Sequence, residues 1–283
     1  MVTARPIRLG ISFGWQGRVD RLVAQARRAE HAGFDTVLLT DHLGYAAPLP
    51  PLVAIAAAVP SVRVGNLVIN ASFHRPALLA RDLASVDSAT GGRLEIGLGA
   101  GYVAEEFAAA GVPFADYNAR VRLLTEHVLA LRGWLADPGY TPPAFQQPPP
   151  ILVAGMGTGV LSAAAEHADI VAIGTLADED RLVEQVNHVK RRAGSRLDEI
   201  ELSFGFFQVS MDRPDDLSEL RQIRPDATDS ELRRMACLLE GSVDQAADRI
   251  RRLHQELGIS YFTFSKTAAT SWATLERLVD ALG

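Results

Sequence analysis

The chain has 283 residues, of which 48% are hydrophobic and 22% charged, a composition typical of a globular enzyme rather than a disordered protein. Its formal net charge of −6, without a long run of lysine or arginine, argues against nucleic-acid binding. A single cysteine, Cys237, excludes an internal disulfide and fits a reducing cytoplasm.

The N-terminal segment has neither the apolar region nor the cleavage site of a signal peptide. The most apolar long stretch, 48–60, is too short to cross a bilayer, so we expect no membrane association. These features predict a cytoplasmic protein. Its length suits one large α/β domain spanning 1–283.

Short apolar runs alternate with longer amphipathic segments along the chain. Strands are predicted, in order, at 7–13, 36–40, 63–69, 93–98, 151–154, 170–173, 200–209 and 261–264. Helices are predicted at 19–34, 52–58, 76–89, 118–135, 160–167, 179–193 and 271–282. Gly33 is suited to ending the first helix, and Pro76 to starting the third.

About eight β–α units in this length predict a closed (β/α)8 TIM barrel with parallel strands, with an open doubly wound sheet as the alternative. Two segments interrupt the alternation and predict short insertions after strands four and seven. The proline-rich segment 137–150 is interpreted as an extended connector. The polar segment 211–237 is interpreted as a loop and helix over the top of the barrel.

The active site of such a barrel lies at the C-terminal ends of its strands. Asp41 and His42 follow the second strand and are the leading acid–base candidates, because imidazole titrates near neutrality. A structural role for the histidine is the alternative. The seven histidines are scattered without metal-ligand spacing, so no metal site is expected.

The GMGTG run, Gly155 to Gly159, follows the fifth strand and precedes a helix. Backbone N–H groups of such a loop can bind an anion at the helix N-terminus. The run lacks the Walker lysine and the dinucleotide spacing, so it favours a single phosphate, with a plain glycine-rich turn as the alternative.

Glycines 97, 99 and 101 alternate along or just past the fourth strand. Such spacing either admits a flat ring or serves tight barrel packing. Aromatic residues at strand ends could form an apolar substrate pocket or belong to the ordinary core; they are Phe13, Trp15, Tyr45, Phe73, Tyr102 and Phe207.

Several segments together resemble the luciferase-like superfamily of flavin and deazaflavin oxidoreductases, and within it the members that use coenzyme F420. They span nearly the whole chain in the family's order: 29–42, 64–87, 90–102, 120–131, 148–173 and 240–253.

The resemblance implies a barrel with the cofactor ring over the strand ends. It places His42 beside the ring, supported by Asp41, and the cofactor phosphate on the loop 155–159. Asn70 and Ala71 fall near a bulge where family members can carry a non-proline cis peptide, which we expect within 69–72. The implied cofactor-binding residues are His42, Asn70, Ala71, Gly101, Tyr102, Ala154, Gly155, Met156, Gly157, Thr158, Gly159 and Gly174.

Two departures from the family pattern bear on the substrate. Tyr102 stands where sugar-phosphate dehydrogenases of the family carry a glutamate acid, which argues against sugar-phosphate oxidation. The proline-rich connector is shorter than usual, which indicates a more open pocket or one completed by a partner subunit.

The leading hypothesis is an oxidoreductase that transfers a hydride between F420 and a small organic substrate. A monooxygenase using reduced FMN and O2 is the alternative, and a non-catalytic flavin-binding relative is a third. We expect a homodimer, for which the apolar segment 52–59 is one candidate surface.

Overall fold

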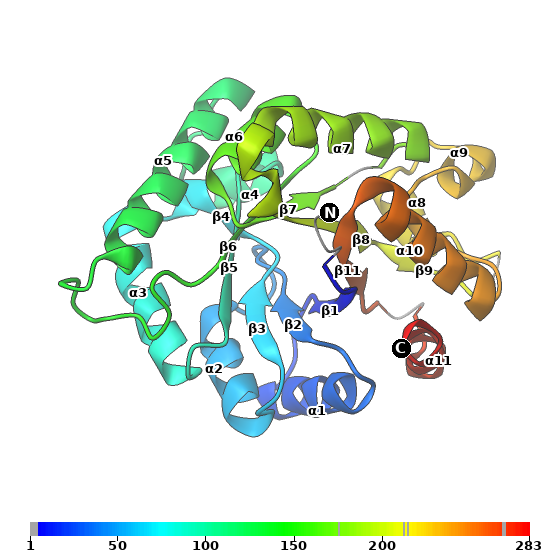
Figure 1. Cartoon of the computed structure of the whole chain (residues 1–283), viewed down its shortest axis with the longest axis horizontal. Helices are drawn as coiled ribbons and strands as arrows, with labels where there is room; N and C mark the ends of the chain where they lie inside the picture. Colours follow the sequence, from blue (N-terminus) through cyan, green and yellow to red (C-terminus); the bar gives the residue numbers. More distant parts are fainter. Residues whose placement is uncertain (1–4, 175, 212, 214, 268–269) are drawn as a thin grey trace.

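The computed structural model describes residues 5–174, 176–211, 213, 215–267 and 270–283, so residues 1–4 of the segment tested for a signal peptide lie outside it. Parallel strands close into an eight-stranded barrel surrounded by helices (Figure 1). The strands are β1 (Arg8–Phe13), β2 (Thr36–Leu39), β3 (Arg63–Asn66), β4 (Ile69–Asn70), β5 (Leu94–Gly99), β6 (Ile151–Gly155), β7 (Ile170–Ile173), β8 (Glu201–Phe206) and β11 (Ile259–Ser265). Pairing of β1 with β11 and of β3 and β4 with β5 closes the cylinder, which confirms the predicted barrel.

The surrounding helices pack an apolar face against the strands. They are α1 (Val19–His31), α2 (Leu49–Ala58), α3 (Pro76–Ala89), α5 (Tyr117–Ala136), α6 (Thr158–His167), α7 (Glu179–Ala193), α10 (Val243–Leu257) and α11 (Trp272–Leu282). In α1 the buried residues Leu22, Ala26 and Ala29 follow the helical period. Gly33, two residues beyond the helix, has a φ of 89°, which explains the glycine there.

The third strand of the barrel differs from its prediction. The expected strand 63–69 divides into β3 and β4, with a cis peptide between Leu67 and Val68. The predicted location of a non-proline cis bond, within 69–72, is therefore wrong by two residues. The irregular segment turns toward β5, where Gly99 has no side chain and leaves room for Val68.

The elements outside the regular β/α alternation follow β5 and β8, which are the fourth and seventh strands of the barrel. The short helix α4 (Ala104–Ala109) follows β5. The predicted strand 200–209 ends its barrel pairing at Phe206, and β9 (Gln208–Val209) instead pairs with β10 (Leu238–Leu239). Between them lie α8 (Ser218–Ile223) and α9 (Asp229–Arg233). The short 3-10 helices are Ala71–Phe73 and Gly194–Asp198.

The lower half of the barrel interior is filled by large side chains. Tyr261 of β11 is fully buried, and a Cβ on Gly10 would lie 2.8 Å from its ring. The residues packed with it are Leu38, Leu152, Ile170 and Ala172. Since strand side chains alternate between the interior and the helices, this packing fixes which residues face inward above it.

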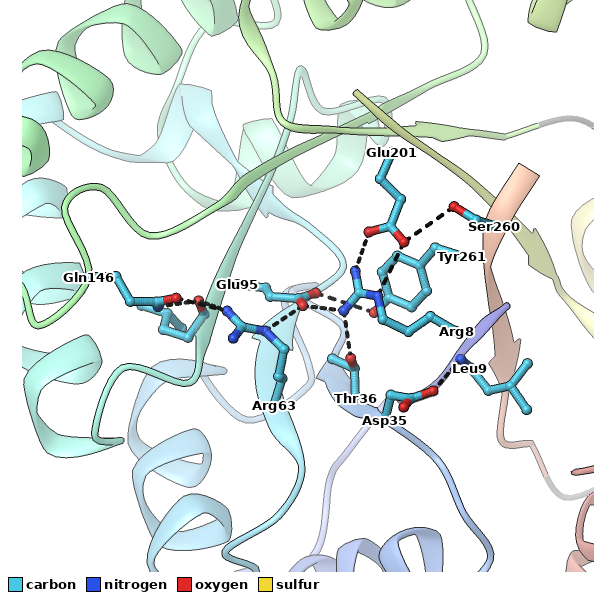
Figure 2. Close-up of polar contacts among 11 residues, drawn as sticks. Arg8, Leu9, Asp35, Thr36, Arg63, Glu95, Gln146, Glu201, Ser260 and Tyr261 are labelled. Atoms are coloured by element: carbon cyan, nitrogen blue, oxygen red, sulfur yellow. Dashed lines mark hydrogen bonds and ion pairs between the residues drawn. The ribbon is translucent and has the colours of Figure 1, made fainter. Parts of the chain in front are cut away.

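An ionic cluster closes the N-terminal end of the barrel, and Figure 2 shows it. This basal cluster comprises Arg8, Arg63, Glu95, Glu201 and Tyr261. Glu95 is 2% exposed and pairs with Arg8 and with Arg63, the latter at 2.7 Å. Arg8 also pairs with Glu201 at 2.7 Å and lies over the Tyr261 ring, 3.7 Å from its centre. The charges compensate one another within the cluster.

Candidate active site

A cavity of about 450 Å³ lies at the C-terminal ends of the strands, opposite the basal cluster. Of the residues predicted from sequence, those that line it are Asp41, His42, Asn70, Gly101, Tyr102, Ala154, Gly155, Met156, Gly157, Gly174 and Phe207. The chain thus brings together residues at the ends of six different strands of the barrel.

The other predicted residues lie beside the cavity or away from it. Ala71 is buried in the 3-10 turn after β4, and Thr158 and Gly159 form the first turn of α6, which begins two residues earlier than expected. Phe13 lies on the outward face of β1 against Trp272, and Phe73 packs against Phe107 of α4. Trp15 and Tyr45 belong to the loops after β1 and β2, and the Tyr45 ring approaches His42 edge-on.

His42 has an acidic partner that was not predicted. Its Nδ1 lies 2.7 Å from a carboxylate oxygen of Glu106 on α4. An ionised Glu106 accepts a hydrogen bond from Nδ1–H, so neutral His42 presents an unprotonated Nε2. That nitrogen lies 3.5 Å from the Tyr102 hydroxyl, and all three side chains line the cavity. His42 can therefore accept a proton there, and Glu106 stabilises the cation that results.

Asp41, which was expected to support His42, has a different environment. Burial raises its pKa above the usual 3.8, while the nearby His74, His42 and a backbone hydrogen bond at Asn70 oppose that rise. Burial also lowers the pKa of His74, against the attraction of Asp41. Asp41 is thus a carboxyl group in a poorly solvated cavity wall.

Packing of aromatic rings holds α4, and with it Glu106, against the barrel. Phe107 is 1% exposed and lies between Phe73 and Phe114, with ring centres 4.9 Å from each. Because Glu106 precedes this buried anchor directly, its carboxylate is directed toward His42.

The N-terminus of α6 offers the cavity backbone N–H groups. Its N-cap is Gly157, which has no side chain to cap the first turn. The N–H of Val160 donates to the Tyr117 hydroxyl at 3.2 Å, and a Cβ on Gly157 would lie 2.2 Å from that oxygen. Gln185 supports the loop from behind by donating to the Met156 carbonyl at 2.7 Å.

A positive charge lies near this helix terminus. Arg120, in the first turns of α5, donates to the carbonyl oxygens of Gly101 and Ala115 and lines the cavity. An anion between α6 and α5 would meet the arginine, the tyrosine hydroxyl and the helix dipole together. The donor set fits one phosphate group of a cofactor.

The alternating glycines of β5 serve the packing of the barrel itself. A Cβ on Gly97 would lie 1.9 Å from the Asn66 carbonyl oxygen, and one on Gly99 2.6 Å from Val68. Gly101 has a φ of 74°, and its Cβ would meet the Asn70 side chain. Gly99 and Gly101 also line the cavity, and the admission of a flat ring there stays a prediction.

Sequence reasoning missed several polar residues of the cavity. Glu106 lies on α4, a helix that periodicity did not predict. Tyr117 lies one residue before the predicted helix 118–135, and Arg120 lies within it but was not assigned to the site. Hydroxyl side chains of the cavity were not assigned to the site either, namely Ser12, Thr40, Ser203, Thr263 and Ser265. The available signal was the alternation of Ser203 with Gly205 and of Thr263 with Ser265.

The described residues include neither a membrane-spanning helix nor a metal-binding cluster. No helix there is long and apolar enough to cross a membrane. No cluster of three or more histidine, cysteine, aspartate or glutamate side chains in this part of the chain could hold a metal ion.

A closed parallel barrel with an acid–base pair and an anion-binding helix terminus at its open end is an enzyme-like arrangement. A family model described as luciferase-like monooxygenase matches residues 5–235. The chain therefore belongs to the luciferase-like monooxygenase family, which confirms the resemblance found in the sequence.

Similar proteins use more than one cofactor. The chain is 28% identical over 218 residues to a 5,10-methylenetetrahydromethanopterin reductase of Methanolobus tindarius, covering 72% of this chain and 66% of that protein. It is 31% identical over 131 residues to an FMNH(2)-dependent dimethylsulfone monooxygenase of Pseudomonas putida, covering 44% and 35%. These matches span less than two thirds of the length of either curated relative.

A solved structure shows the same fold. The coenzyme F420 dependent tetrahydromethanopterin reductase from Methanopyrus kandleri superposes with a TM-score of 0.81 at 16% identity, covering 98% of this chain and 99% of that one. At this identity the likeness concerns the barrel alone.

Proposed function

We propose that this chain is an oxidoreductase that transfers a hydride between coenzyme F420 and a small organic substrate. The observation that carries the proposal is the His42–Glu106 pair, 2.7 Å apart at the cavity wall. Hydride transfer to or from carbon is accompanied by a proton at the neighbouring heteroatom, and a carboxylate-supported imidazole is suited to move it.

The residues present fit a cofactor that ends in a phosphate. Tyr117, Arg120 and the first-turn amides of α6 would bind that group. A bound deazaflavin would donate the hydride in the reducing direction and accept it in the oxidising direction. Asn70 and Gly101, together at the ends of β4 and β5, would lie beside its ring.

The chain manages the proton. His42 Nε2 takes a proton from an alcohol in one direction and returns it to a carbonyl oxygen in the other. Glu106 holds Nδ1–H, so the imidazole keeps the tautomer and the orientation that this exchange needs. Tyr102 is close enough to hydrogen-bond the same nitrogen and would be displaced by the substrate oxygen.

A second candidate function is oxygenation with reduced FMN. It is favoured by the similarity to the FMNH(2)-dependent monooxygenase, and the phosphate-binding residues would serve FMN equally well. Under either candidate function we expect a cytoplasmic homodimer, and light scattering would measure the oligomeric state.

Titration of the purified chain with F420 and with FMN tests the proposal. We expect quenching of F420 fluorescence with a Kd at least tenfold below that for FMN, and loss of F420 binding in Arg120→Ala. Arg181→Ala, on the exposed side of α7, is the matched control. Tight FMN binding without F420 binding would replace the first candidate with the second, and binding of neither would reject both.

A further inference from the structure

One wall of the cavity is built differently from the rest. Strands β8, β11 and β1 are neighbours, and their inward residues at cavity height are small or carry hydroxyl groups. The lining members with hydroxyls are Ser12, Ser203, Thr263 and Ser265, which we call the hydroxyl wall. The next strands round the barrel, β7 and β6, present Ala172 and Ala154 instead.

Glycines beside the wall make room for its side chains. Gly205 and Gly10 flank Thr263 in the strand register. A Cβ on Gly205 would lie 2.9 Å from the Thr263 hydroxyl oxygen, so the hydroxyl occupies that position, and the Tyr261 ring occupies the space beside Gly10.

One hydroxyl of the wall has no protein partner. Ser203 is 1% exposed, and its Oγ forms no hydrogen bond within the described part of the chain. Ser12 has only a long contact of 3.4 Å to Ser265. A buried hydroxyl without a hydrogen-bond partner costs free energy, so the hydroxyl wall is suited to a guest that supplies a partner.

Charge is divided between the two sides of the cavity. Among the described lining residues, Arg120 is the only arginine or lysine, and it lies with α6 on the phosphate side. The acidic groups, Asp41 and Glu106, follow β2 and β5, outside the wall. Burial raises the pKa of Asp41, which indicates poor solvation of charge there. A charged guest on the hydroxyl wall would therefore lose hydration without gaining an ion pair.

We infer that the hydroxyl wall is a substrate subsite for an uncharged organic molecule with a hydrogen-bonding oxygen, such as a ketone or a secondary alcohol. The inference rests on the proposed function, because this molecule is a substrate only if a cofactor binds beside it. Ser203 and Thr263 hydrogen-bond an oxygen of the guest other than the one that exchanges a proton with His42, and neither moves a proton. The wall, among the described residues, offers no cation to pair with a phosphorylated or carboxylated substrate.

Binding of size-matched probes to the cofactor-free protein tests the subsite. Cyclohexanone, cyclohexanecarboxylate and cyclohexylammonium would be titrated by ligand-observed NMR. We expect the ketone to bind at least tenfold more tightly than either ion. Equal or tighter binding of the carboxylate or the ammonium would overturn the inference.

Variants locate the ketone. Thr263→Val preserves shape and removes one hydroxyl, and Ser203→Ala removes the other. Together they should weaken ketone binding by about three- to tenfold, from the net strength of hydrogen bonds. Ser162→Ala is the matched control, because its hydroxyl bonds His188 on the outer helices. Unchanged ketone affinity in the double variant, with circular dichroism confirming its fold, would reject the assignment.

The same variants separate substrate from cofactor. A carbonyl on the cofactor ring has the chemistry that the wall would bind. If the double variant weakens F420 or FMN more than the ketone, the wall holds the ring and the subsite inference fails. If the wild type binds neither cofactor but binds the ketone at the wall, the proposed function fails and the neutral binding site stands.

Discussion

The two ends of this barrel differ in the size and charge of their inward side chains. At the N-terminal end, Glu95 is buried and shared by Arg8 and Arg63, above which Tyr261 fills the interior. At the C-terminal end, inward positions carry glycine, alanine and serine, and a cavity of about 450 Å³ remains. The closed end holds the cylinder together, which leaves the open end free to keep poorly satisfied polar groups.

Removal of the shared carboxylate at the closed end should have the largest effect. Glu95→Ala leaves Arg63 partly buried without its counter-charge and Arg8 with Glu201 alone, so we expect the free energy of unfolding to fall by about 3–5 kcal/mol. Urea denaturation measures it. Glu184→Ala breaks an exposed pair with Arg181 and should cost under about 1 kcal/mol. Equal losses in both variants would remove the distinction between the closed end and ordinary surface charge.

At the open end the largest effect should be on rate. His42→Ala removes the proposed proton carrier, so turnover of F420 with an active substrate should fall about 10²- to 10⁴-fold. Because the side chain is partly exposed, the unfolding midpoint should stay close to that of the wild type. His188→Ala, on the outer face, controls for loss of an imidazole. Unchanged turnover in His42→Ala would leave its role structural.

Glu106 should act through His42. Glu106→Gln keeps the shape and removes the charge-assisted hydrogen bond, so turnover should fall about 10- to 100-fold. The independent readout is the tautomer of His42, from ¹⁵N chemical shifts of labelled imidazole. Wild type should show the Nδ1–H form, and the variant a mixture. Glu105→Gln is the neighbouring control. A tautomer that is unaltered in Glu106→Gln would refute the positioning role.

Asp41 should show the smallest effect, and with a stabilising sign. Its pKa is raised by burial, so the folded state disfavours the ionised carboxyl, and stability falls as pH rises through that pKa. Asp41→Asn should therefore raise Tm at pH 7 by roughly a degree or two. Below the ordinary value of 3.8 the gain should disappear, since both states are then protonated. A lower Tm at pH 7 would show that Asp41 stabilises the open end.

Periodicity predicted the barrel because its strands and helices are regular where they pack. The helices 76–89 and 179–193 coincide with α3 and α7, and Ile170–Ile173 was predicted to the residue. Prediction failed where the chain departs from regular pairing. Leu67–Val68 interrupts the third strand of the barrel, and Gln208–Val209 pairs with Leu238–Leu239 outside the barrel. Such exchanges of partner depend on tertiary contacts that apolar spacing does not encode.

The candidate site divided along similar lines. Residues next to strand ends, such as His42 and Gly157, could be placed at the cavity from order along the chain. Glu106 could not, because α4 has six residues, too few to show a helical period. Its position depends on Phe107 packing between two other rings. The position of Tyr117 at the N-terminus of α6 likewise depends on its contact with Val160, 43 residues away in sequence.

The pairing of β1 with β11 also governs when the protein can be completed. Ser12 and Ser265 lie side by side although 253 residues separate them. During synthesis β1 must therefore wait, with one edge unpaired, until the final strand leaves the ribosome. Exposed strand edges invite association with other chains, and distant pairing slows closure. A chain truncated before residue 259 would accordingly have two open strand edges, so we expect loss of the segment 259–283 to favour aggregation.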